Sequence, residues 1–122
     1  MSNNEPAFPF FVSTDVRPLS QVERSIVLRL VSEKAPDFKH QLDQLVVVGR
    51  CGCGVCPTVF FQHYDAESRE RKVASYMGQD SSGGEVGALL FENDGRLSQL
   101  DIYSVDGHEP YGAPEPASLR PC

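Results

Sequence analysis

The stretch Val86-Gly-Ala-Leu-Leu-Phe-Glu-Asn-Asp-Gly-Arg-Leu-Ser-Gln-Leu-Asp-Ile-Tyr-Ser-Val105 decides the fold. It holds two strand-like runs on either side of an Asn-Asp-Gly triplet. The pair Asp94-Gly95 suits the positive φ angles that a tight hairpin turn requires at its two central positions. We therefore predict two paired antiparallel strands that meet at Asp94-Gly95, with Leu90 and Leu100 on buried faces.

Three further strand-like runs precede this hairpin. They are Val46–Arg50, Thr58–Tyr64 and Lys72–Met77, and each is rich in β-branched or aromatic residues. A polar segment over residues 65–70 joins the second run to the third. The composition of residues 78–84, Gly-Gln-Asp-Ser-Ser-Gly-Gly, predicts a loop before the hairpin.

Two helices are predicted ahead of the strands. Ser20 and Glu23 have the spacing of a capping box, in which each side chain accepts a hydrogen bond from a free backbone N–H group. Pro36 favours the first turn of a second, shorter helix. The apolar residues at helical spacing are Val22, Ile26, Val27, Leu30 and Val31 up to about Lys34, then Phe38, Leu42 and Leu45.

Together these elements predict an α+β fold, with two N-terminal helices packed on an antiparallel meander of four to five strands. We divide the chain into an N-terminal arm over residues 1–17, a single α+β domain over 18–105, and an extended C-terminal tail over 106–122. The tail is rich in Pro and Gly, which excludes a helix or a central strand. We expect Tyr111 and Leu119 to hold it on the domain.

The charge of the chain argues against two classes of partner. Seventeen acidic and eleven basic residues give a net charge of −6, which opposes nucleic-acid backbones and anionic membrane surfaces. No apolar run approaches the ~20 residues of a membrane span. The N-terminus has no basic region, and its short apolar stretch is broken by Pro6 and Pro9, so we predict no signal peptide. These features predict a cytoplasmic protein.

The candidate site is Arg50-Cys-Gly-Cys-Gly-Val-Cys-Pro57, which holds three of the four cysteines. Closely spaced cysteines in a reducing compartment are more often metal ligands or redox groups than structural disulfides. A zinc site would use Cys51, Cys53 and Cys56, with a fourth ligand from His63, His108 or Cys122.

Two other interpretations of these cysteines stay open. Cys53 and Cys56 form a C-x-x-C pair that can cycle a disulfide, but the helix that would stabilise the first thiolate is not predicted after Pro57. The cysteines can also be small residues that serve only a tight turn.

No catalytic motif stands out elsewhere. Asp106 and Glu109 near His108 can form an acid–base pair, although polar loops often contain such triplets. The chain has no G-x-S-x-G nucleophile elbow and no strand–GxxxxGK–helix phosphate loop. We therefore expect a non-catalytic domain that binds another protein, with a zinc-stabilised binding domain and a thiol-dependent redox protein as alternatives.

The cysteine turn and the segment Leu89–Ser104 resemble a group of small bacterial proteins of uncharacterised function. That group combines a helical N-terminal half, a Cys-x-Cys-Gly turn and a segment of the form LLFxxDGxLSxLEIYS. In its pattern the third cysteine directly follows the glycine, whereas Val55 intervenes here. The resemblance covers roughly residues 18–119. It implies a bacterial cytosolic protein and favours an interaction role, such as an immunity or regulatory protein, without assigning any catalytic residue.

Overall fold

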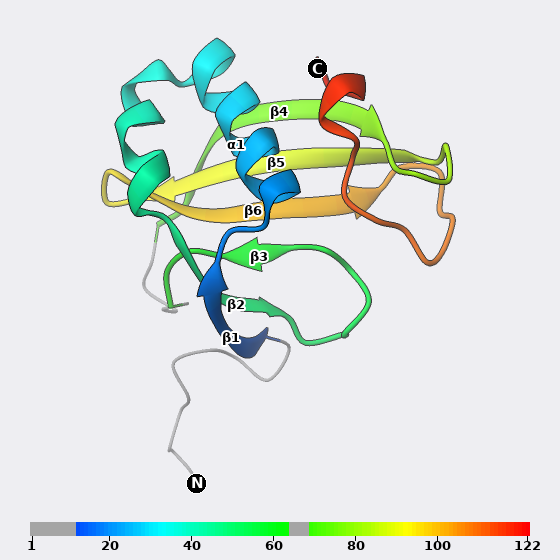
Figure 1. Ribbon diagram of the computed structural model, residues 1–122, viewed down its shortest axis with the longest axis horizontal. Helices are drawn as coiled ribbons and strands as arrows, with labels where there is room; N and C mark the ends of the chain where they lie inside the picture. The colour runs from blue at the N-terminus through cyan, green and yellow to red at the C-terminus, as the bar shows by residue number, and fades with distance from the viewer. Residues whose placement is uncertain (1–11, 64–68) are drawn as a thin grey trace, which may run out of the picture.

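The computed structural model describes residues 12–63 and 69–122, which form one antiparallel sheet of seven strands in the order β1-β2-β3-β6-β5-β4-β7 (Figure 1). An α-helix and two 3-10 helices accompany the sheet. The strands are β1 (Val12–Pro18), β2 (Val46–Cys51), β3 (Val59–Phe60), β4 (Arg71–Gln79), β5 (Glu85–Asn93), β6 (Arg96–Ser104) and β7 (Arg120–Pro121), and the helices are α1 (Gln21–Lys34), η1 (Pro36–Gln44) and η2 (Pro116–Ser118).

The predicted arrangement of two helices on a meander of four to five strands is wrong. Strands β4, β5 and β6 do follow one another, but β3 pairs with β6, so the order β3-β6-β5-β4 is that of a Greek key. The second predicted helix is the 3-10 helix η1. Two more strands come from segments assigned to the arm and the tail: β1 pairs with β2, and β7 pairs with β4.

The strand predicted over Thr58–Tyr64 is shorter than expected. Strand β3 contains only Val59 and Phe60, and Tyr64 lies outside the described residues, as does most of the polar segment that follows it. The Thr58 side chain adds to the contact between β3 and β6. Its hydroxyl accepts a hydrogen bond from the Ile102 N–H (2.9 Å) and donates to the Asp101 carboxylate (2.9 Å). A side chain therefore continues the contact between β3 and β6 where backbone pairing ends.

The predicted hairpin is confirmed. Asn93 pairs with Arg96, and the two residues between them have positive φ angles, 56° at Asp94 and 80° at Gly95. Leu90 and Leu100 lie opposite each other and are fully buried. The local sequence signal and the final structure therefore agree over this hairpin.

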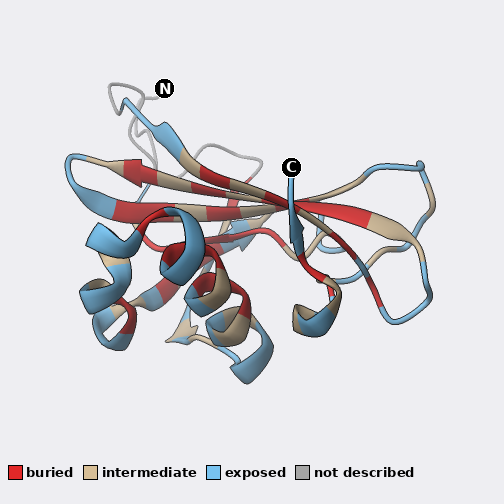
Figure 2. Cartoon of the chain, turned by 90° about the horizontal axis from the view of Figure 1, so that it is seen from above, coloured by how far each residue is buried: buried red, intermediate tan, exposed pale blue. Residues whose placement is uncertain are grey.

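Helix α1 begins at the predicted capping box and covers one face of the sheet (Figure 2). The Ser20 hydroxyl accepts from the Glu23 N–H (3.1 Å), and the Glu23 carboxylate accepts from the Ser20 N–H (2.8 Å). Val22 is 45% exposed, so the apolar stripe is narrower than predicted. The residues of α1 that belong to the main core, together with their partners on β4, β5 and β6, are Ile26, Val27, Leu30, Val31, Ala74, Tyr76, Val86, Ala88, Leu90, Leu97, Leu100 and Ile102.

The C-terminal segment is held on the loop between β4 and β5 by His108. The imidazole Nε2 lies 2.9 Å from the carboxylate of Asp80, which is 3% exposed, and Nδ1 contacts Asp106. The Asp80 carboxylate also accepts hydrogen bonds from the backbone N–H groups of Gly84 (3.0 Å) and Gly112 (3.1 Å). One buried carboxylate thus connects the β4–β5 loop to two points of the C-terminal segment.

The ionisation of this cluster follows from its geometry. Hydrogen bonding to Asp80, and then to Asp106, raises the pKa of His108 above its usual value. The same bond to His108 is the main cause that lowers the pKa of Asp80, and it lowers the pKa of Asp106 to about 2. Beyond the cluster the segment places Tyr111 against His108, with ring centroids 6.1 Å apart, and Leu119 is buried in the main core.

Replacing Ile26 by Ala tests the assignment of the buried face of α1. The change opens a cavity in the main core and should cost about 2–4 kcal/mol of unfolding free energy. Val22→Ala on the exposed side is the matched control and should stay within about 0.5 kcal/mol of the parent. Urea denaturation measures both values. Equal costs for the two variants would contradict the assignment.

The cluster around His108 predicts a pH-dependent contribution to stability. Because the folded pKa of His108 is raised, its contribution is complete below the unfolded pKa of ~6.5 and is lost as the pH rises through the higher folded value. The carboxylates have lowered pKa values, so their contribution is lost as the pH falls below about 4. The Tm difference between the parent and His108→Gln should be largest between these limits and decrease towards pH 9.

Thermal melts of the two proteins from pH 4.5 to 9 measure this difference. His40→Gln is the control, because His40 is exposed and lies outside the cluster. This variant removes an imidazole that makes none of the contacts of the cluster, so it should not reproduce the loss of stability difference that His108→Gln shows towards pH 9. A constant difference for His108→Gln would contradict the proposed charge coupling.

Candidate metal centre

The cysteine-containing segment forms the connection between β2 and β3 (Figure 1). The Cys51 N–H donates to the Thr58 carbonyl (3.3 Å), which closes the loop, and the Gly54 N–H donates to the Cys51 carbonyl (3.3 Å). Gly54 has a φ of 81°, a conformation that a residue with a Cβ atom rarely adopts. The glycine therefore allows the chain to turn back within the C-x-x-C segment.

The loop brings the three cysteine sulfurs together. The Sγ atoms of Cys51, Cys53 and Cys56 all lie within 4.8 Å of one another, and Cys53 is exposed while the other two are half-buried. The Cys51 thiol donates to the Cys53 sulfur at 3.2 Å. Thiolates are soft ligands that select zinc and monovalent copper over hard cations. Three of them at this separation can hold one thiophilic metal ion.

The backbone of the loop stabilises a thiolate at Cys53. Its Sγ accepts hydrogen bonds from the N–H groups of Val55 (3.4 Å) and Cys56 (3.3 Å), and these bonds lower the pKa of Cys53 to about 7. Burial, followed by hydrogen bonding to Cys56, raises the pKa of Cys51 to about 12. The thiols of Cys51 and Cys53 are therefore inequivalent, and Cys53 loses its proton before Cys51.

The sequence prediction missed this source of stabilisation. It considered only a helix N-terminus after Cys56, and the structure indeed has no helix there, since Pro57 leads into β3. The stabilising N–H groups belong instead to the turn between Cys53 and Cys56. The only sequence signal for them is the glycine at position 54, which permits a turn but does not reveal where its N–H groups point.

Tyr111 from the C-terminal segment lies beside this loop. Its hydroxyl donates to the Ile102 carbonyl (3.3 Å). Burial raises the pKa of Tyr111 to about 12, and the charge of the nearby Cys56 is the second cause of that rise. The C-terminal segment that His108 holds in place thus brings the Tyr111 phenol next to the cysteines. From the sequence, Tyr111 is expected only to hold the tail on the domain.

None of the three predicted fourth ligands joins the cysteines. Among the described residues, the group of potential ligands contains the three cysteines alone. His108 is engaged with Asp80 and Asp106. The Cys122 N–H is bonded to the Ser75 carbonyl on β4, and His63 is exposed after β3.

The predicted acid–base group around His108 also differs from the structure. Asp106 contacts the imidazole as expected, but Glu109 is exposed and is not among the groups that raise the pKa of His108. The second carboxylate is Asp80, which is 28 positions earlier in the chain. No local sequence pattern connects two residues so far apart.

Comparison with protein-family models, curated proteins and solved structures finds no match to this chain. No helix within residues 12–63 and 69–122 is long and apolar enough to cross a membrane. The function therefore has to be inferred from the geometry of the cysteine loop and its surroundings.

Proposed function

We propose that this protein is a non-catalytic binding domain in which Cys51, Cys53 and Cys56 hold one zinc ion. The observation that carries the proposal is the convergence of three Sγ atoms within 4.8 Å on a single loop. The hydrogen bonds that the Cys53 sulfur receives from two backbone N–H groups support it, because they stabilise the thiolate form that binds metal.

Zinc suits this ligand set better than other abundant cations. Zn²⁺ binds thiolates at about 2.3 Å and accepts tetrahedral geometry without a redox change. Three protein ligands leave one coordination position for water or for a side chain of a bound protein. The site would then stabilise the loop and present it to a partner, in keeping with the interaction role expected from the sequence.

A second candidate function is thiol–disulfide exchange. It is favoured by the pKa of about 7 at Cys53 and by the 3.2 Å contact between the sulfurs of Cys51 and Cys53. The Cys53 thiolate would attack a small disulfide such as oxidised glutathione and release one thiol. A second cysteine of the loop would then displace the other thiol, which leaves a protein disulfide. Bound zinc and this reaction exclude each other, because both use the same sulfurs.

Removing the three thiols together tests the zinc site. The parent should bind about one zinc per chain, and EDTA should lower its Tm. At a free zinc concentration 100-fold above Kd the stabilisation is about 2.7 kcal/mol, equivalent to on the order of 10 °C in Tm. The Cys51→Ser, Cys53→Ser, Cys56→Ser variant should bind no zinc and show no response to EDTA. Metal analysis and thermal melts measure both effects.

Cys122→Ser is the matched control, because Cys122 lies beside β4, near the opposite edge of the sheet from the cysteine loop. It should keep the zinc content and the EDTA response of the parent. A parent that takes up no zinc after reconstitution in reducing buffer, and melts at the same temperature with or without EDTA, would exclude the metal site.

The inequivalence of the thiols gives a separate prediction for the metal-free protein. Alkylation of Cys53 by iodoacetamide should reach half its maximal rate near pH 7, whereas Cys51 should react slowly until the pH is well above 9. Peptide mass spectrometry after timed quenching gives each rate, and added zinc should protect both residues. Equal rates for Cys51 and Cys53 at pH 7 would contradict the described hydrogen bonding.

A further inference from the structure

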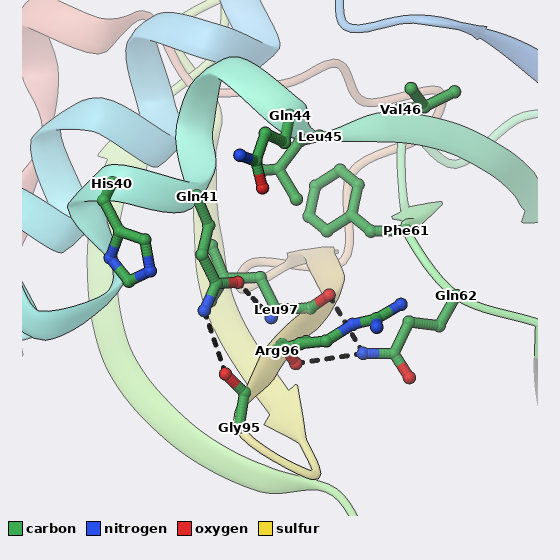
Figure 3. Close-up of a pocket in the computed structure, with 10 residues that line it drawn as sticks. All are labelled: His40, Gln41, Gln44, Leu45, Val46, Phe61, Gln62, Gly95, Arg96 and Leu97. Atoms are coloured by element: carbon green, nitrogen blue, oxygen red, sulfur yellow. Dashed lines mark hydrogen bonds between the residues drawn. The ribbon is translucent and has the colours of Figure 1, made fainter.

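A hollow of about 560 Å³ lies between helix η1, the start of β2, the residues after β3 and the β5–β6 turn (Figure 3). Its size is within the range of small-molecule sites in proteins, about 300–1,000 Å³. Val46 lines the hollow, and Cys51 begins the cysteine loop. These are the first and last residues of β2, and they lie about 16 Å apart along the strand. It is therefore distinct from the proposed metal site.

The walls of this hollow are fixed by two glutamines. Gln41 donates to the Gly95 carbonyl (2.9 Å) and accepts from the Leu97 N–H (2.9 Å). Gln62 donates to the carbonyls of Arg96 (3.0 Å) and Leu97 (3.2 Å). Figure 3 shows the two amides bonded to the hairpin backbone. Because both are already engaged, they shape the hollow and do not bind a ligand.

The charge of the lining differs from that of the whole chain. Among the described residues, the lining includes Arg96 and His40 and contains no Asp or Glu, although the whole chain has seventeen acidic residues against eleven basic ones. Within the described residues, the Arg96 guanidinium makes no hydrogen bond or ion pair, and Figure 3 shows only its backbone carbonyl engaged. Within the part of the chain that the structure describes, the hollow thus offers the Arg96 cation without a neutralising acid in its wall.

The remaining wall is apolar. Leu45, Val46 and Phe61 line it, and Val46 is 43% exposed, although it belongs to a strand. A guanidinium binds a carboxylate through two parallel hydrogen bonds, and an apolar wall beside it favours a ligand with a hydrocarbon body. We propose that this hollow binds a small organic carboxylate, with the carboxylate on Arg96 and an apolar or aromatic body on Val46 and Phe61. This proposal goes beyond the metal site and does not depend on it.

The experiment compares 3-phenylpropionate with its neutral isostere 3-phenylpropionamide on the full chain. Each compound is titrated up to 10 mM while the backbone amides are followed by NMR. The carboxylate should bind at least ~10-fold more tightly than the amide, as expected for a charge-assisted bidentate contact. The affected amides should be those of residues 41–46, 61–62 and 95–97.

Two variants establish the origin of the preference. Arg96→Gln should reduce the carboxylate-to-amide ratio to near one, while its unperturbed amide spectrum shows that the fold is kept. Lys72→Gln, an exposed cation on β4 outside the hollow, should bind both compounds like the parent.

Several outcomes would overturn the proposal. These are equal affinity of the parent for the two compounds, no binding of the carboxylate at 10 mM, shifts confined to amides elsewhere, or a preference that persists in Arg96→Gln.

Discussion

The sheet is continuous because a strand of only two residues, β3, joins the β1–β2 pair to the hairpin strands β5 and β6. Val59 and Phe60 supply its backbone pairing to β6, and the Thr58 hydroxyl extends the junction to Ile102 and Asp101. Both candidate sites depend on this junction. The cysteine loop closes at Thr58 on one side of it, and Phe61 and Gln62 on the other side complete the wall of the hollow. The backbone pairing of a two-residue strand therefore positions both candidate sites.

The cysteine loop has a defined backbone conformation, and the thiols of Cys51 and Cys53 differ in how readily they lose a proton. Its backbone directs two N–H groups at Cys53, which favours the thiolate there, whereas burial keeps Cys51 protonated. A metal ion bound to all three sulfurs has to displace the proton of Cys51, so its apparent affinity increases with pH. The same asymmetry makes Cys53 the first sulfur that a reactive compound meets when no metal is bound. Occupancy and reactivity of the loop are therefore linked.

Features encoded within a few residues could be predicted from the sequence. The Asp94-Gly95 turn and the Ser20–Glu23 capping box follow from local backbone chemistry, and the proximity of three cysteines follows from their spacing. The strand order could not be predicted, because β1 and β7 pair with strands far along the chain and β7 is only two residues long. The bond between Asp80 and His108, and the N–H groups at Cys53, depend on three-dimensional placement in the same way.

Among the described residues, the two outermost strands of the sheet are β1 and β7, and both end in proline, at Pro18 and Pro121. Proline has no backbone N–H, so it cannot donate to an additional strand from another molecule. Long unprotected sheet edges are templates for aggregation, and natural proteins interrupt them with short strands, bulges and prolines. Strand β1 also contains a register shift between Thr14 and Arg17, and β7 is only two residues long. The segments that enlarge this sheet therefore also limit its further growth by addition of strands at β1 and β7.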